Sequence, residues 1–134
     1  MNSVILTKLI VAMILGAFLG LERELRQKPG GIKTNGLVSL ASCAFVLIVE
    51  EVNPEEKARV ITGIIQGVGF IGGGMILKGG NNAKGLTGAA EIWISAGFGL
   101  ACAVGLWRLA ITVLLLSLIL LKTMKMFFRK FINH

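Results

Sequence analysis

Charged residues in this chain fall in short clusters, and the stretches between the clusters are apolar runs of about 18 to 20 residues. Because an α-helix rises 1.5 Å per residue, a run of this length matches the roughly 30 Å hydrocarbon core of a bilayer. In that core every backbone N–H and C=O group must find a partner within the protein, and a continuous apolar run meets this requirement as a helix. The chain is 54% hydrophobic, and this arrangement predicts an all-α, polytopic membrane protein.

About five apolar runs are long enough to be transmembrane helices. We expect a transmembrane domain over residues 1–126, with helices over 3–21, 34–52, 60–78, 86–106 and 108–126, and a basic cytoplasmic tail over 127–134. The last two runs are almost continuous, but about 41 residues is too long for one crossing, so we expect a tight turn near Gly105. The N-terminal run resembles a signal peptide but lacks a small-residue cleavage site, and we interpret it as a retained first helix.

Basic residues set the expected orientation. Ten of the 14 Lys and Arg residues lie in the 22–33 and 78–85 loops and after residue 121, and the other four lie on the opposite side. The positive-inside rule then places the N-terminus outside and the C-terminus in the cytoplasm. We attribute the formal charge of +7 to loops that face anionic lipid, because no compact basic domain is present to bind nucleic acid.

The run from Gly63 to Trp93 is rich in glycine. Glycine costs about 1 kcal/mol per helical position relative to alanine, so a cluster of glycines in one predicted span needs a reason. One reason is packing, because glycines four residues apart let two helices approach closely. The other is binding, in which the Gly72–Gly74 triplet unwinds its helix and presents backbone groups to a solute or ion. Small residues with such spacing are Gly16, Gly20, Gly63, Gly67, Gly69, Gly73, Gly97, Ala101 and Gly105.

Two familiar kinds of chemistry find no support. Residues 67–72 form a literal GxGxxG, but the dinucleotide-binding pattern needs a preceding strand and a soluble βαβ unit, and here it lies within a membrane-length run. The chain has no Asp or Tyr, and its single His is His134. A Ser-His-Asp triad and a histidine-based zinc site are therefore excluded, and we expect no enzyme activity, no cofactor and no nucleic-acid partner.

Two polar residues lie within the apolar runs around the glycine-rich segment. Gln66 must pair its amide inside the membrane, so we expect it to face the helix bundle, either as a link between helices or in a polar pathway. Glu91 lies near the cytoplasmic end of its predicted helix, where a carboxylate can reach water or be protonated. It either forms a salt bridge with Lys33, Lys78 or Lys84, or takes part in ion coordination or proton coupling, which makes it the candidate metal ligand.

A charged motif ends the first predicted span. Glu22 and Arg26 are spaced for an i,i+4 ion pair. The segment Glu22–Glu24, with Arg23 between the two carboxylates, could also gate a pathway or form a docking surface packed against residues 33–35. Thr34 and Asn35 are suited to cap the start of the second span.

Four sequence blocks occur in an order that is typical of one family. The blocks are GAFLGLERE, PGGIKTNGLVSLASCAF, GIIQGVGFIGGGMILKGG and AKGLTGAAEIWISAGFGLACAVG, and they cover most of residues 10–105. In these blocks the chain resembles the MgtC/SapB family of bacterial inner-membrane proteins. The motif positions that the resemblance marks are Gly20, Glu22, Arg23, Glu24, Gly31, Thr34, Asn35, Gly67, Gly69, Phe70, Gly72, Gly74, Gly85, Leu86, Thr87, Ala89, Ala90, Trp93 and Gly99.

The resemblance implies a small multi-helix membrane protein associated with magnesium homeostasis. For pathogenic members it also implies a virulence-related role, through adaptation to low magnesium and survival inside host cells. It implies a regulator, because inhibition of the membrane ATP synthase is the proposed role of the family prototype, and it makes Mg²⁺ the metal to test at Glu91. Three features depart from the family pattern: Lys33 stands where Arg is usual, Glu91 stands where a small residue is expected, and the soluble C-terminal domain of many members is missing here.

We therefore expect a glycine-packed inner-membrane protein that forms a homodimer, or another homo-oligomer, or binds a second membrane complex such as ATP synthase. It would act in magnesium or envelope homeostasis. The alternative is a small ion or solute transporter or channel, with a polar site between the third and fourth spans. The candidate functional or packing residues are Glu22, Arg23, Glu24, Thr34, Asn35, Gln66, Gly67, Gly69, Gly72, Gly73, Gly74, Thr87, Glu91 and Trp93.

Overall fold

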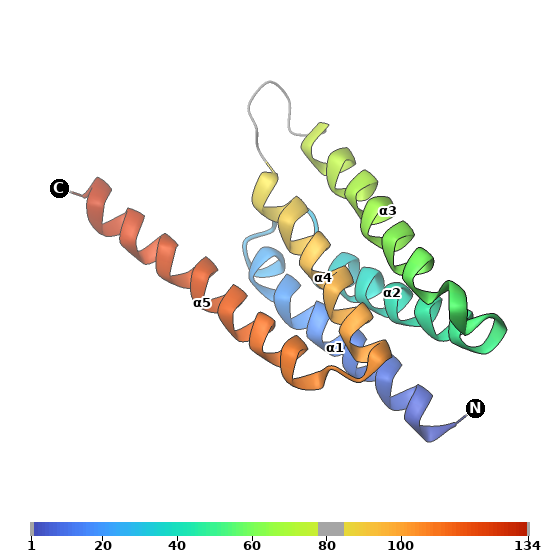
Figure 1. Cartoon of the computed structure of the whole chain (residues 1–134). Coiled ribbons are helices and arrows are strands. Elements are labelled where there is room, and N and C mark those ends of the chain that lie inside the picture. The colour runs from blue at the N-terminus through green and yellow to red at the C-terminus, as the bar shows by residue number, and fades with distance from the viewer. Residues whose placement is uncertain (1, 78–84, 134) are drawn as a thin grey trace.

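The computed structural model describes residues 2–77 and 85–133, which form five long helices and one short 3-10 helix (Figure 1). The elements are α1 (Ser3–Leu25), α2 (Ile32–Val52), η1 (Pro54–Glu56), α3 (Lys57–Leu77), α4 (Leu86–Val104) and α5 (Trp107–Ile132). The 5 long helices have the length and composition needed to cross a membrane, and the described residues contain no β-strand. The predicted all-α, polytopic fold is confirmed.

Helices α1, α2 and α4 pack against one another, and α3 packs mainly on α4. The buried core lies among them, where Leu19, Val46, Phe98 and Cys102 are almost completely shielded. Helix α5 contacts α4 and α1, and its C-terminal half points away from the bundle (Figure 1). The N-terminus, η1 and the α4–α5 turn lie at one end of the bundle, and the α1–α2 loop and the start of α4 lie at the other (Figure 1).

The tight turn that the sequence predicts between the last two spans is confirmed. Gly105 has a φ of 82°, a left-handed conformation that glycine adopts at little cost. The N–H of Leu106 donates to the carbonyl oxygen of Ala101 over 2.8 Å, which satisfies a carbonyl at the end of α4. Helix α5 begins directly afterwards at Trp107 and continues to Ile132, so most of the 127–134 tail is helical.

Glycines in α1 and α4 bring both helices into backbone contact with α2. A Cβ atom added to Gly16 would lie 2.8 Å from the Cβ of Ser39, and one added to Gly20 would overlap a carbonyl oxygen at the start of α2. One added to Gly99 would lie 2.8 Å from the amide nitrogen of Cys43. Only glycine permits this separation, so the packing role predicted for Gly16 and Gly20 is confirmed.

Other predicted glycine contacts differ in the structure. Helix α3 is continuous through Leu77, so the alternative in which Gly72–Gly74 unwinds its helix does not occur. Gly72 packs on α4, where an added Cβ would lie 3.3 Å from the Cβ of Ala89. At the other five glycines of α3 an added Cβ would meet no atom within 4 Å in the part of the chain that the structure describes. The sequence also predicts close packing through Gly97, Ala101 and Gly105. Gly97 does not take part in such a contact, because a Cβ added to it would meet no atom of the described residues within 4 Å.

Candidate functional site

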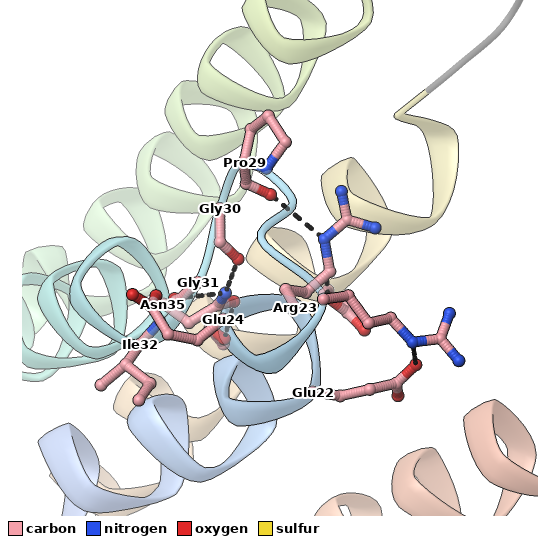
Figure 2. A network of polar contacts seen from close by, with 11 residues as sticks. Glu22, Arg23, Glu24, Pro29, Gly30, Gly31, Ile32 and Asn35 are labelled. Atoms are coloured by element: carbon pink, nitrogen blue, oxygen red, sulfur yellow. Dashed lines mark hydrogen bonds and ion pairs between the residues drawn. The ribbon is translucent and has the colours of Figure 1, made fainter.

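Buried polar side chains gather near the end of the bundle where α1 turns into α2. We call this group the polar cluster: Arg23 of α1, Asn35 of α2, and Glu91 and Ser95 of α4, together with the backbone of residues 29–31. Figure 2 labels Arg23, Asn35 and residues 29–31. All four side chains are buried. Polar groups in such surroundings are stable only when they pair with each other, so the pairing decides what the cluster can do.

Asn35 joins the α1–α2 loop to α4. Its Nδ2 donates to the carbonyl oxygen of Gly30 over 2.6 Å and to that of Gly31 over 3.0 Å. Its Oδ1 accepts a hydrogen bond of 2.6 Å from the Oγ of Ser95. Because both ends of the amide are used and the side chain is 0% exposed, Asn35 acts as a fixed structural link between three segments.

Arg23 and Glu91 form a buried ion pair between α1 and α4. The Nε of Arg23 lies 3.7 Å from the Oε2 of Glu91, with side-chain exposures of 9% and 4%. The same Nε donates to the carbonyl oxygen of Pro29 over 3.1 Å (Figure 2). Gly88 makes room for the guanidinium, since a Cβ there would lie 2.6 Å from the Nη2 of Arg23. Two buried charges of opposite sign stabilise each other, and removing either one leaves the other uncompensated.

The predicted partners of Glu91 were lysines, and the structure gives it an arginine instead. Lys78 and Lys84 lie outside the described residues. The sequence places both Arg23 and Glu91 at the cytoplasmic end of their helices. Two opposite charges at the same membrane depth are therefore the sequence signal that could have identified this ion pair.

Glu24 caps α2 from the neighbouring helix. Its Oε2 accepts a hydrogen bond of 3.1 Å from the backbone N–H of Ile32, the first residue of α2 (Figure 2). A carboxylate at this position satisfies a free N–H group and complements the helix dipole. The prediction that Thr34 and Asn35 cap this helix is therefore wrong. The predicted pair of Glu22 and Arg26 is confirmed, with 3.4 Å between Oε1 and Nε.

Of the remaining predicted residues, Thr87 lines a cavity beside Arg23 and Glu91, whereas Gln66 and Trp93 do not. Gln66 lies on the exposed face of α3, which differs from the prediction that it faces the bundle. Glu91 is buried against α1, so one protomer does not bring Gln66 and Glu91 together. Thr87 and Trp93 are exposed on α4. Among residues 2–77 and 85–133, no group of three His, Cys, Asp or Glu side chains is placed to hold a metal ion.

Five apolar helices with a buried polar cluster at one end define a polytopic α-helical membrane protein. The chain belongs to the MgtC family, whose sequence model matches residues 9–130. It is similar to Protein MgtC of Salmonella typhimurium, with 40% identity over 110 residues, which is 81% of this chain and 48% of that protein. An uncharacterized protein of Synechocystis is 38% identical over 133 residues, which is 96% of this chain and 55% of that protein.

Protein MgtC of Brucella abortus is also similar, with 40% identity over 96 residues, which is 71% of this chain and 40% of that protein. The chain thus spans about half the length of the curated relatives it matches. No solved structure matches it. The resemblance carried by the four sequence blocks is confirmed at the level of the family.

Proposed function

We propose that this chain is a regulatory membrane protein that binds a helix of another membrane complex through one face of α3. We call this the glycine face; it consists of Gly63, Gln66, Gly67, Gly69, Phe70, Gly73 and Gly74. At a helical period of 3.6 residues these positions share one side of α3. The observation that carries the proposal is that a Cβ added to any of these five glycines would meet no atom of the described residues within 4 Å.

The glycine face differs from the other exposed helix surfaces. Helix α5 exposes long aliphatic side chains such as Leu116, Ile119 and Leu120, which lipid tails cover as well as protein does. A glycine surface has little to offer a lipid tail, but it lets a second backbone approach closely. The same residue type already performs this task in the chain, at Gly16 and Gly20 of α1 against α2.

Gln66 gives the glycine face a polar group that lipid cannot pair. It lies nine residues after Lys57, roughly 13 Å along α3 and therefore near the middle of the bilayer. Moving an unpaired amide from water into hydrocarbon costs about 4–8 kcal/mol. A partner helix that supplies a hydrogen-bonding side chain removes this cost. A second copy of this chain also carries such an amide, so a homo-oligomer is the competing occupant.

We further propose the inner membrane as the location, with the N-terminus outside, and magnesium or envelope homeostasis as the process, as the family resemblance implies. The arrangement of the helices supports this orientation, because the α1–α2 loop and the start of α4 share one end of the bundle, toward which α5 also runs (Figure 1). Eight of the 14 Lys and Arg residues lie within residues 22–33 or after residue 121. ATP synthase is the first partner to test, and we propose no enzyme activity.

Transport is the alternative, and the core weighs against it. The polar cluster lies at the α1–α2 loop end, and its hydrogen bonds are made within the chain. Toward the other end, α2 and α4 pack through the apolar side chains of Val46, Phe98 and Cys102. A path for ions needs polar or hydrated groups along its length.

Flux measurements separate regulation from transport. Proteoliposomes that contain only the purified chain should show no Mg²⁺ flux above empty liposomes. Flux that is present in the native chain and lost in Glu91→Gln would contradict the regulatory proposal and support transport.

A substitution on the glycine face tests the proposed docking. Gly67→Leu should fold normally, because its Cβ meets open space, but it should block close approach of a partner helix. We expect this variant to co-purify no membrane partner. We also expect it to fail to restore growth at low magnesium when it is expressed in cells that lack the native chain. Gly97→Leu is the matched control on α4, because Gly97 is equally open; it should keep both. Full rescue and unchanged co-purification in Gly67→Leu would contradict the proposal.

A further inference from the structure

A cavity of about 610 Å³ opens between α1, α4 and α5, beside the polar cluster. It exists because α5 leaves the bundle at an angle and does not pack along the whole length of α1 and α4 (Figure 1). Its volume lies within the range of small-ligand sites in proteins, about 300–1,000 Å³. The proposed docking face is on α3, so this cavity is independent of it.

One end of the cavity is lined by more positive than negative groups. Arg23, Arg26 and Lys28 face it, together with the carboxylates of Glu22 and Glu91. Each carboxylate is ion-paired with an arginine: Glu22 lies 3.4 Å from the Nε of Arg26 and Glu91 lies 3.7 Å from the Nε of Arg23, although the Oε2 of Glu91 makes no hydrogen bond among the described residues. With all five groups charged, the net charge is positive.

Donor groups of the two arginines remain for a ligand. The Nη2 of Arg26 is buried and has no hydrogen-bond partner among the described residues. The hydrogen bond of Arg23 to the α1–α2 loop uses Nε, and in the described part of the chain its two Nη atoms make none. Buried guanidinium donors are normally satisfied, and a phosphate group is a ligand that fits their geometry.

The rest of the cavity is apolar and runs toward the middle of the membrane. Its walls include Ile94 of α4 and Leu120 of α5. From Leu86 to Ile94 the cavity follows α4 for about 12 Å. A site with a basic end and an apolar groove matches a molecule with an anionic head and a hydrocarbon chain, rather than a small free anion.

We propose that this cavity binds an anionic phospholipid from the surrounding membrane. The phosphate of the headgroup pairs with Arg26 and Lys28, next to Arg23, and an acyl chain lies in the groove between α4 and α5. Basic pockets between transmembrane helices are known to bind anionic headgroups in this way. The lipid satisfies the free arginine donors and fills the space that the divergence of α5 leaves.

Native mass spectrometry of the purified chain in detergent tests the proposal. The probes are phosphatidylglycerol, phosphatidylcholine with the same acyl chains, and inorganic phosphate. We expect phosphatidylglycerol to bind more tightly than phosphatidylcholine. The double variant R26Q/K28Q should lower the affinity for phosphatidylglycerol about 25-fold, since each basic residue near an anionic headgroup raises the affinity about fivefold. The control K33Q/K125Q removes two charges that do not line the cavity, and it should keep the preference.

A second pair of variants tests the apolar groove without changing charge. Ser117→Phe places a ring inside the groove, because Ser117 lines it, whereas Leu116→Phe changes a neighbouring exposed position that does not. Ser117→Phe should weaken lipid binding about tenfold, the effect of losing roughly two buried methylene groups. Leu116→Phe should leave it unchanged.

Four results would overturn the proposal. Equal binding of the two lipids, or unchanged preference in R26Q/K28Q, would remove the headgroup site. Displacement of phosphatidylglycerol by millimolar phosphate would mean that the site takes a free anion. Loss of a dimer mass in Ser117→Phe, with lipid binding intact, would mean that a second copy of the chain fills the groove.

Discussion

The contact between α2 and α4 at Gly99 gives the sharpest prediction about the fold. A Cβ atom at this position would overlap the carbonyl oxygen of Ser39 and would lie 2.8 Å from both the amide nitrogen of Cys43 and the Cβ of Ser42. Two of these three atoms belong to the backbone, so no side-chain rotation relieves the contact. Gly99→Ala must therefore push the two helices apart.

The size of the effect follows from this geometry. Ordinary van der Waals contact begins at about 3.4 Å, so α2 and α4 must separate by at least about 0.6 Å. A separation of that size removes about a quarter to a half of the van der Waals energy of each atom pair that α2 and α4 bring into contact. Overpacking of a core typically lowers the free energy of unfolding by about 1–3 kcal/mol. Gly97→Ala is the matched control, because it makes the same change in the same helix but faces open space. Both variants gain about 1 kcal/mol of helix propensity, so their difference isolates the contact.

The assay is unfolding of the purified chain in mixed micelles as the fraction of SDS increases. The fluorescence of Trp93 and Trp107, the 2 tryptophans of the chain, reports the transition. Gly99→Ala should be less stable than Gly97→Ala by about 1–3 kcal/mol. Equal stability of the two variants would refute the close approach of α2 and α4.

Two further variants test the polar cluster in the same assay. Arg23→Met and Glu91→Met should each cost about 3 kcal/mol, because each leaves one buried charge unpaired, and the double variant should be more stable than either single one; additive losses would contradict the ion pair. Asn35→Ala should cost about 2–4 kcal/mol, since three hydrogen bonds of about 0.5–1.5 kcal/mol each are lost. Thr34→Ala, at the preceding position, is its control, and its free energy of unfolding should stay within about 0.5 kcal/mol of that of the native chain. An equal loss of stability in both variants would show that the hydrogen bonds of Asn35 do not form.

Much of the fold could be predicted because its causes are local. The length of each apolar run predicts a membrane-spanning helix, and Gly105 predicts the turn between α4 and α5. The pair of Glu22 and Arg26 follows from helical spacing alone. Each of these inferences needs only residues that are close together in the sequence.

The polar cluster could not be predicted in full, because its contacts depend on how helices are rotated and where they cross. The bond from Ser95 to Asn35 joins residues 60 positions apart. The cap of α2 comes from Glu24 on another helix, which a search for capping residues near position 34 does not find. The pairing of Arg23 with Glu91 has the same origin.

The glycines show the same limit most clearly. Gly16 and Gly20 in α1 have the four-residue spacing that also occurs at Gly63 and Gly67 in α3. The first pair packs on α2, whereas a Cβ added to either glycine of the second pair meets no atom within 4 Å among residues 2–77 and 85–133. A spacing pattern predicts that a helix can be approached closely, but it does not say which helix approaches it.

The central claim is that the glycine face of α3 binds another membrane protein, and crosslinking from Phe70 in intact membranes tests it most directly. Phe70 lies on this face and is 85% exposed, so a photoreactive phenylalanine analogue can replace it with little change. Phe18 on α1 is 55% exposed and serves as the control position. We predict a crosslink from position 70 to a different membrane protein, its loss in Gly67→Leu, and no such product from position 18. Adducts with lipid alone, or crosslinks only to a second copy of this chain, would contradict the claim.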